Sequence, residues 1–348
     1  MTEIFFLQPL RLCAFASKIF PKLIGCLALL FLLISCQEEA APDLPPETAV
    51  PEATASPTET PMPQSNFRVI AYVTASITPE TIPYDRLTHI NYAFLIPNPD
   101  GTFAPFANGW KLKNIAAQAH AADVQVLISV GGWGWEEQFE AMAADPATRA
   151  AFVQNLTDFV AEYDLDGADI DWEYPQPGQP SQNFLALIQE LRVAMPDKLL
   201  TTAVVSYGSN AEGVLSETFP LFDFINVMTY DGPDHGTMSQ FQTGLEYWQG
   251  RGLRPEKTVM GVPFYSRPGE AIYRNIVAAD PQAAYSDTIE WNGVTNHYNG
   301  IPTIQNKTKI AMERAGGIMF WTLDHDALDD LSLLQAIDEV VQAEDGGE

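Results

Sequence analysis

The stretch "LDGADIDWEYP", from Leu165 to Pro175, places carboxylates at every second position, on Asp169, Asp171 and Glu173. Because alternate residues of a β-strand point to opposite faces, a strand here directs the three carboxylates to one face and the apolar residues between them to the other. Like charges this close cannot all ionise cheaply, so at least one pKa should be raised. The pattern predicts a strand with an acidic inner face, which ends in Glu173 as a general acid.

Outward from this stretch, the chain repeats one unit: a short apolar or β-branched run, a loop and a helical pattern. Eight runs are predicted to be strands: 68–73, 89–96, 124–132, 167–172, 199–207, 222–230, 258–265 and 316–323. Helical patterns between them cover 110–122, 146–163, 181–195 and 301–315. Strands that alternate with helices pair in parallel, so eight units predict an α/β fold, the closed (β/α)8 TIM barrel, over residues 67–345. An open doubly wound sheet is the alternative. In a barrel, the carboxylates climb towards the carboxyl-terminal mouth, where barrel enzymes carry their site.

Two further segments precede the predicted barrel. Basic residues followed by the apolar run 23–35 predict a secretory signal peptide over residues 1–35, because the run is short for a stable membrane span. The end of this run, "LISC", resembles a bacterial lipobox, which predicts an exported lipoprotein anchored through Cys36 at the cell surface or in the periplasm. An ordinary signal peptide or an uncleaved anchor is the alternative. Residues 36–66 are rich in Pro, Thr, Glu and Ala, which predicts a disordered linker.

The composition argues against several classes of partner. The 45 acidic and 18 basic residues give a formal charge of −27, which repels nucleic acid and anionic lipids, so we expect membrane contact through the lipid anchor only. The three cysteines are Cys13, Cys26 and Cys36, so the predicted barrel can contain neither a disulfide nor a cysteine zinc site. The stretch "DHD" (324–326) favours a capping loop over a metal site. We therefore expect a monomer with no metal and no cofactor.

The acidic stretch resembles the D-x-x-D-x-D-x-E motif of family 18 glycoside hydrolases, the chitinase family, with every position filled from Asp166 to Glu173. Further motifs of that family follow in its order: "LISVGG" (127–132), "VMTYDG" (227–232), "GVPFYSR" (261–267) and "GGIMFWTLDHD" (316–326). The resemblance extends from Phe67 to about Val341. It implies a retaining hydrolase that cleaves β-1,4-linked N-acetylglucosamine, in chitin or chitooligosaccharides, by substrate-assisted catalysis.

The resemblance also implies roles for single residues. Glu173 would protonate the glycosidic oxygen, and Asp171 would orient the acetamido group of the substrate, which attacks in place of an enzyme nucleophile. Asp169 would share a proton with Asp171, and Tyr230 would donate a hydrogen bond to the acetamido carbonyl. Asp166 is equally compatible with a turn and with a supporting role. The implied substrate-binding positions are Tyr72, Ser129, Gly131, Met228, Asp231, Tyr265, Arg267 and Trp321, and Trp133 in "GGWGW" (131–135) is expected to be a sugar-stacking ring at the rim of the groove.

Two of these positions, Tyr72 and Ser129, would hydrogen bond to the lower aspartates, and Trp321 would form the floor of the sugar site. Two features depart from the family pattern. Ser266 replaces a common glycine, and the connection before the eighth strand is short, which implies a shallower cleft suited to mid-chain cleavage or short oligosaccharides. An endo-β-N-acetylglucosaminidase acting on the chitobiose core of N-glycans is the alternative enzyme. A chitinase-like lectin that binds sugar without cutting is the non-enzyme alternative, and the presence of Glu173 argues against it.

Overall fold

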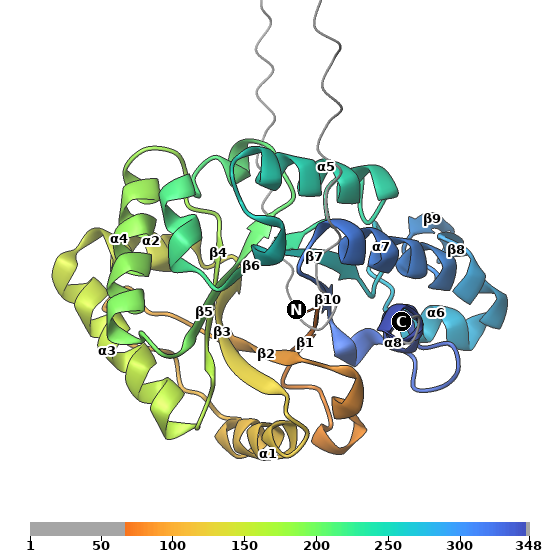
Figure 1. The fold of residues 1–348 in the computed structure, drawn as a ribbon, viewed down its shortest axis with the longest axis horizontal. Coiled ribbons are helices and arrows are strands. Elements are labelled where there is room, and N and C mark those ends of the chain that lie inside the picture. The colour runs from red at the N-terminus through yellow and green to blue at the C-terminus, as the bar shows by residue number, and fades with distance from the viewer. Residues whose placement is uncertain (1–66, 346–348) are drawn as a thin grey trace, which may run out of the picture. The chain divides into compact units, whose positions relative to one another are not determined.

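The computed structural model describes residues 67–345, in which eight parallel strands close into a barrel (Figure 1). In their order around the barrel, the strands are β1 (Arg68–Val73), β2 (His89–Leu95), β3 (Gln125–Trp133), β4 (Gly167–Glu173), β5 (Leu199–Val205), β6 (Phe224–Met228), β7 (Thr258–Pro263) and β10 (Gly317–Trp321). The predicted TIM barrel is confirmed, and the open-sheet alternative is wrong. The predicted signal peptide and linker, with Cys36, lie outside the described residues.

Helices surround the strands in Figure 1. The four predicted helices form as α1 (Gly109–His120), α3 (Pro146–Glu162), α4 (Gln179–Ala194) and α7 (Ile301–Arg314). The structure adds α2 (Glu136–Ala144), α5 (Met238–Gly250), α6 (Tyr273–Ala279) and α8 (Leu333–Asp345). Short 3-10 helices cover Pro79–Thr81, Tyr84–Arg86, Ser209–Ala211, Ser216–Leu221, Pro255–Lys257, Pro281–Tyr285 and Leu323–His325. The connection between β7 and α7 contains α6 and a hairpin of β8 (Thr288–Trp291) and β9 (Val294–His297).

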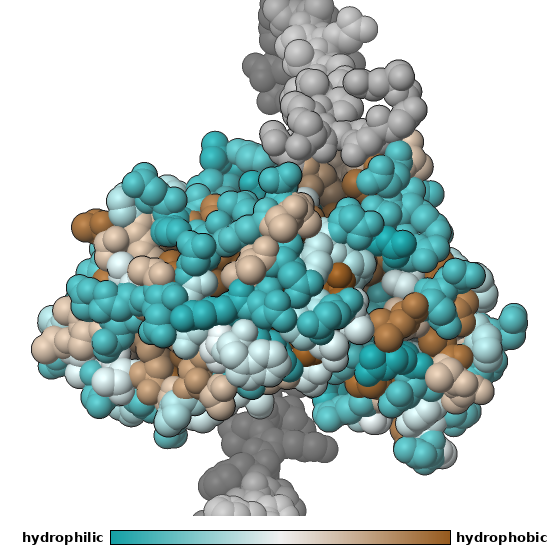
Figure 2. Space-filling view, turned by 90° about the horizontal axis from the view of Figure 1, so that it is seen from below, coloured by the Kyte–Doolittle hydropathy of each residue, from teal (hydrophilic) through white to brown (hydrophobic). Residues whose placement is uncertain are grey.

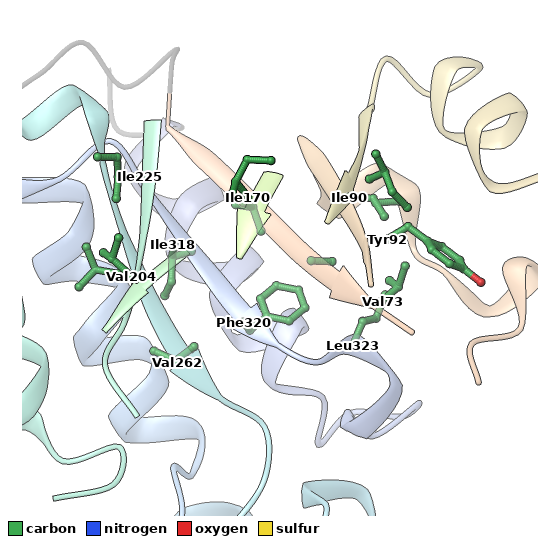
Figure 3. Close-up of a cluster of buried hydrophobic side chains, with 14 of the residues drawn as sticks. Val73, Ile90, Tyr92, Ile170, Val204, Ile225, Val262, Ile318, Phe320 and Leu323 are labelled. Atoms are coloured by element: carbon green, nitrogen blue, oxygen red, sulfur yellow. The ribbon is translucent and has the colours of Figure 1, made fainter. Parts of the chain in front are cut away.

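Two apolar clusters hold this architecture together. The larger one fills the space between the outer faces of the strands and the helices, and Figure 3 shows part of it around Ile170 and Ile225. The smaller one lies inside the barrel and includes Ile70, Phe224 and Met319. Burial of such apolar surface contributes about 25 cal/mol per Å² to folding. The barrel interior is therefore packed rather than hollow.

On β4 the predicted alternation is confirmed. The outward residues Ala168, Ile170 and Trp172 belong to the larger cluster, and the Trp172 ring stacks on Phe139 at 5.2 Å between centroids. The carboxylates point inward, and strand register sets their neighbours. Asp169 pairs with Ser129 on β3 and Thr201 on β5, while Glu173 pairs with Trp133 at the end of β3.

All eight strands run in the same direction, so the barrel has two distinct ends. The chain enters the barrel at Arg68, at the amino-terminal end of β1, whereas Glu173 and Trp321 end their strands at the opposite mouth. The side of the molecule drawn in Figure 2 is mostly hydrophilic, with apolar residues scattered over it. Within residues 67–345, each helix is too short or too polar to cross a bilayer.

Candidate active site

Asp169 lies at the bottom of the site, fully buried, and accepts four hydrogen bonds. Its Oδ2 accepts from the hydroxyls of Tyr72 and Ser129, both at 2.8 Å. Its Oδ1 accepts from the Thr201 hydroxyl at 2.6 Å and the Asn226 amide at 3.3 Å. Burial raises the pKa of Asp169, and the four donors oppose that rise. Because hydrogen bonds hold both of its oxygens, the Asp169 carboxylate has a fixed position beneath Asp171.

Asp171, the next carboxylate up the strand, is 3% exposed and lines the pocket. Its Oδ1 is buried and has no hydrogen-bond partner among residues 67–345. Burial raises the pKa of Asp171 well above its ordinary value, and the negative charges of Glu173 and Asp169 raise it further. An unpartnered buried carboxyl oxygen is costly, so this atom is suited to a ligand's N–H or O–H group.

Glu173 ends the strand at the pocket and accepts a 2.7 Å hydrogen bond from the Tyr174 hydroxyl on Oε2. Burial raises the pKa of Glu173 to about 7, the Tyr174 hydrogen bond opposes the rise, and the charges of Asp231 and Glu136 add to it. The sequence pattern predicted a raised pKa from repulsion between carboxylates, and the structure makes burial the larger cause. A carboxyl group with this pKa can both give and take a proton near neutral pH.

A pocket of about 570 Å³ opens above these carboxylates. Aromatic rings line it, among them Trp321, which stacks on Phe94 with centroids 5.3 Å apart and lies 5.6 Å from Tyr72. Trp133 is 78% exposed at the rim, 6.5 Å from the Tyr174 ring. The full lining is Tyr72, Phe94, Trp133, Asp171, Glu173, Tyr174, Met228, Tyr230, Asp231, Tyr265, Arg267, Glu270, Ile272, Trp321 and His325. Carboxyl groups beside flat apolar rings suit a sugar, whose C–H faces pack on aromatic rings.

Asp231, in the loop that follows β6, lines the pocket with its carboxylate. Its Oδ1 accepts hydrogen bonds from the Tyr265 hydroxyl and from Arg267 Nε, both at 2.7 Å, and Arg267 also pairs with Glu270. The Tyr230 hydroxyl beside it contacts Met319 Sδ at 3.9 Å, a weak acceptor. Burial raises the pKa of Tyr230 well above its ordinary value, so this hydroxyl stays protonated as a donor.

Besides Asp169, which lies beneath the pocket, three sequence-selected residues of the barrel do not line it. Ser129 is fully buried beneath it and serves Asp169. Gly131 has φ +110°, and a Cβ there would lie 2.4 Å from the Asp171 carbonyl oxygen, which makes it a point of close strand approach. Asp166 lies just before β4, where its Oδ2 accepts from the Val126 N–H at 2.7 Å and pairs with His120 at 2.9 Å. That places Asp166 at the amino-terminal end of the barrel, away from the pocket.

The pocket also contains residues that the sequence analysis did not select. Phe94, Tyr174, Glu270, Ile272 and His325 line it. Tyr174 could have been identified from the sequence, because it directly follows Glu173. Thr201 and Asn226, beneath the pocket, lie on strands that flank or face β4, and the pairing of Asp169 with Thr201 could have identified the first. Phe94 and Asn226 also lie on strands, β2 and β6, whereas Glu270, Ile272 and His325 lie in connections after β7 and β10, whose conformation the strand pattern does not encode.

The two features singled out after β7 and β10 prove to be structural. Ser266 Oγ lies 3.1 Å from Asn296 Oδ1 on the hairpin and accepts from the Ala271 N–H at 3.0 Å. In the "DHD" stretch, Asp326 accepts from the N–H groups of Leu333 and Leu334 at the start of α8, so the predicted capping loop is confirmed. Within residues 67–345, no three acidic, histidine or cysteine side chains are grouped to hold a metal ion.

Comparisons with known proteins are consistent with this geometry. The model of the Glycosyl hydrolases family 18 matches residues 68–326. Over 235 residues the chain is 30% identical to a probable endochitinase of Caenorhabditis elegans, which covers 56% of this chain and 38% of that protein. Over 408 residues it is 24% identical to chitinase B of Serratia marcescens, which covers 81% of each. The chain thus spans less than two thirds of some relatives, including the nematode protein.

Solved structures give the same result. A chitinase from Bacteroides thetaiotaomicron superposes with a TM-score of 0.73 at 29% identity, over 81% of this chain and 98% of that chain. A family 18 chitinase from the chitin utilization locus of Flavobacterium johnsoniae gives a TM-score of 0.69 at 28% identity, over 80% of this chain and 95% of that one.

Proposed function

Because the chain belongs to family 18 of the glycosyl hydrolases, we propose that it hydrolyses β-1,4-linked N-acetylglucosamine in chitin or chitooligosaccharides. The observation that carries the proposal is the column of Asp169, Asp171 and Glu173 on one strand, which rises into a pocket lined by aromatic rings. The upper two acids line the pocket, and the lowest is fixed by four hydrogen bonds.

We propose substrate-assisted catalysis. Glu173 donates its proton to the glycosidic oxygen as the bond to the anomeric carbon breaks, and the acetamido oxygen of the same sugar forms the new bond to that carbon. The unpartnered Oδ1 of Asp171 accepts from the acetamido N–H and stabilises its developing positive charge, while the Tyr230 hydroxyl donates to the acetamido oxygen. Water then opens the cyclic intermediate, Glu173 takes back a proton, and the β-anomer is retained.

The acid role is tested with Glu173→Gln, which keeps the side-chain shape and removes the proton that is transferred. We expect turnover of a chitooligosaccharide to fall by about 10²–10⁴-fold, while its binding, measured by calorimetry, survives. Glu136→Gln is the matched control, because Glu136 adds its charge to Glu173 from the first turn of α2 without lining the pocket. Wild-type turnover in Glu173→Gln would show that another group protonates the leaving oxygen.

The nucleophile is tested with the substrate. If the acetamido group attacks, chitosan without acetyl groups and cellulose should both resist cleavage, and the first product from chitin, followed by NMR, should be the β-anomer. Asp171→Asn should lower turnover sharply with Glu173 intact. A covalent sugar on a side chain would contradict the mechanism. Release of sugar from an N-glycoprotein but not from colloidal chitin would instead favour the endo-β-N-acetylglucosaminidase, and binding without cleavage would favour a lectin.

A further inference from the structure

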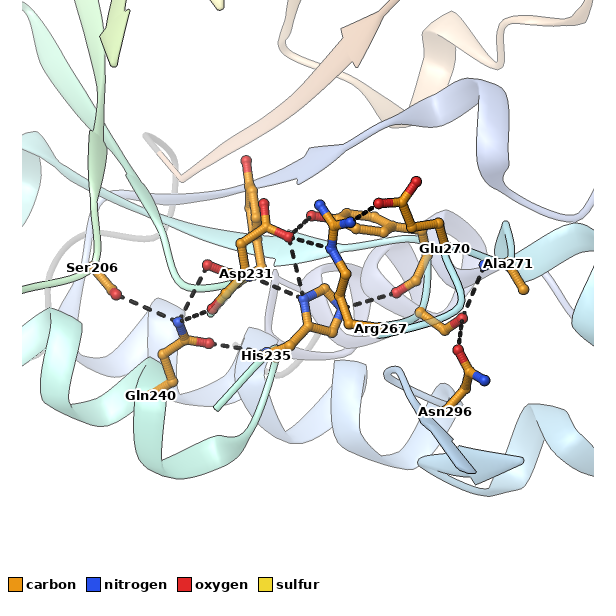
Figure 4. Close-up of polar contacts among 12 residues, drawn as sticks. Ser206, Asp231, His235, Gln240, Arg267, Glu270, Ala271 and Asn296 are labelled. Carbon is orange, nitrogen blue, oxygen red and sulfur yellow. Dashed lines mark hydrogen bonds and ion pairs between the residues drawn. The ribbon is translucent and has the colours of Figure 1, made fainter. Parts of the chain in front are cut away.

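We propose that His235 and Gln240, which lie behind the pocket, are positioning residues that hold Tyr230 and Asp231 in their working conformation. The inference rests on the proposed function for the roles of those two residues. Neither His235 nor Gln240 lines the pocket, and both are buried, so they act through the loop rather than on substrate. Figure 4 shows the two side chains reaching back to the backbone of the loop that follows β6.

Both side chains hold the backbone of Asp231, which has an uncommon conformation. Its φ is +60°, in the left-handed region that residues with a side chain rarely adopt. The Asp231 N–H donates to His235 Nδ1 at 2.9 Å. On the other side, Gln240 Nε2 donates to the carbonyl oxygens of Tyr230 at 3.2 Å and Asp231 at 3.0 Å. The peptide groups on both sides of Asp231 are thus held by side chains four and nine residues further along.

His235 also joins this loop to the end of β7. Its Nε2 lies 3.1 Å from the Tyr265 carbonyl oxygen, and the two rings pack edge to face at 4.9 Å. Because the carbonyl can only accept and Nδ1 already accepts, both bonds require the neutral imidazole with its proton on Nε2. The Tyr265 hydroxyl donates in turn to Asp231 Oδ1, which closes a ring of contacts through three residues. Burial lowers the pKa of His235, and the charges of Arg267 and Lys307 also lower it while Asp231 opposes them.

The Gln240 side chain is itself held by a hydrogen bond from the same loop. Its Oε1 accepts from the Gly236 N–H at 2.9 Å. The Gly236 carbonyl accepts from Lys307 Nζ at 2.6 Å and from the Asn299 amide at 2.7 Å, so the far end of the loop is tied to α7. A rigid frame therefore surrounds the two pocket residues on the side away from substrate, as preorganised sites require.

A matched pair of variants separates this role from simple packing. In His235→Asn the amide oxygen replaces Nδ1 as acceptor for the Asp231 N–H, whereas in His235→Gln the amide nitrogen replaces Nε2 and leaves that N–H unpartnered. We expect His235→Asn to keep kcat for a chitooligosaccharide within about threefold of wild type, and His235→Gln to lower kcat by about ten- to a hundredfold with a smaller change in KM. Equal kcat values for the two variants would overturn the proposal.

Gln240→Glu is a second test. It keeps the oxygen that accepts from the Gly236 N–H and removes the N–H groups that donate to the Tyr230 and Asp231 carbonyl oxygens. Its control is Gln249→Glu near the other end of α5, where Gln249 Nε2 donates to the Arg314 carbonyl at 2.7 Å, far along the helix from the loop. We expect Gln240→Glu to lower kcat by at least about tenfold and Gln249→Glu to leave kcat unchanged. Urea unfolding of every variant checks that it is folded. Equal losses of kcat in Gln240→Glu and Gln249→Glu would contradict the positioning role of Gln240.

A spectroscopic measurement tests the frame without any substrate. In the ¹⁵N NMR spectrum of histidine-labelled protein at pH 7, with His235→Asn used for assignment, His235 should give the shifts of a neutral ring protonated on Nε2. A ring protonated on Nδ1, or charged, would overturn the proposal. If the wild-type protein fails to cleave chitin substrates while His235 shows the expected tautomer, the proposed function fails and the frame stands.

Discussion

At the scale of single residues, Glu173 determines how activity should depend on pH. Its pKa of about 7 means that the acid needed for the first step is lost as pH rises through 7, so kcat/KM should fall there. Tyr174 holds that pKa down through its hydrogen bond. Tyr174→Phe should therefore move the alkaline limb of the kcat/KM profile to higher pH. Tyr207→Phe, which removes a hydroxyl bound to Asp234 on the surface, should leave the limb in place. A downward shift in Tyr174→Phe would contradict this assignment.

The same residue couples folding to pH. The pKa of Glu173 is raised from 4.5 to about 7, so between these values the folded protein binds a proton that the unfolded chain has released. The resulting stabilisation is fully present below pH 4.5 and is lost as pH rises through 7. Glu173→Gln removes it, so the free energy of unfolding in urea should decline less between pH 4.5 and 7.5 in this variant than in wild type. An identical decline in both proteins would contradict the buried, protonated state.

The sequence predicted the residues of β4 well because strand period alone decides which face a side chain takes. It did not predict the four donors to Asp169 as a set, since Thr201 and Asn226 meet this carboxylate only after strands far apart in sequence come into register. Likewise, Gly131 fits the family motif, and in the structure its lack of a side chain allows the close approach to the Asp171 backbone. The sequence motifs therefore identified positions of the site, whereas the contacts of each residue became known only from the packed structure.

At the scale of secondary-structure elements, the strands were predictable and half of the helices were not. Buried parallel strands are continuous apolar runs, which stand out in a sequence. Helix α5 buries Phe241, Leu245 and Trp248, which recur at positions i, i+4 and i+7, but the Gly and Gln residues between them obscure this stripe in "MSQFQTGLEYWQG". The frame around Asp231 depends on α5 through Gln240, so that part of the site could not be predicted from motifs.

The start of α5 can be tested directly. The Thr237 side chain caps the helix by accepting from the Gln240 N–H at 3.1 Å. Loss of such a cap costs about 0.5–2 kcal/mol, so Thr237→Ala should lower the free energy of unfolding by about 1 kcal/mol. Because Gln240 sits in the first turn, kcat should fall as well. Thr295→Ala on the exposed β8–β9 hairpin is the control and should change stability by less than about 0.5 kcal/mol. Equal effects of the two changes on urea unfolding would contradict the cap.

At the scale of the whole molecule, we propose that the protein is exported and anchored through acylated Cys36. The proposal is supported by the "LISC" stretch and the Pro-rich segment that follows it. Cys36→Ala should move the protein from the membrane fraction to the soluble fraction, or block its processing, as followed by fractionation and mass spectrometry of the N-terminus. A wild-type protein found in the soluble fraction with an unmodified N-terminus would contradict the anchor.

The entry of the chain at Arg68, at the barrel end opposite Glu173 and Trp321, has a consequence for access to solid substrates. The polypeptide that leads into Arg68 joins the barrel at its amino-terminal end, opposite the mouth that carries Glu173 and Trp321. An insoluble fibre cannot diffuse into a confined space, so the catalyst must present its open side to the fibre. Coupling this domain to a bead through its leading segment should therefore preserve its capacity to digest particles, whereas coupling through Trp133 at the rim should obstruct it.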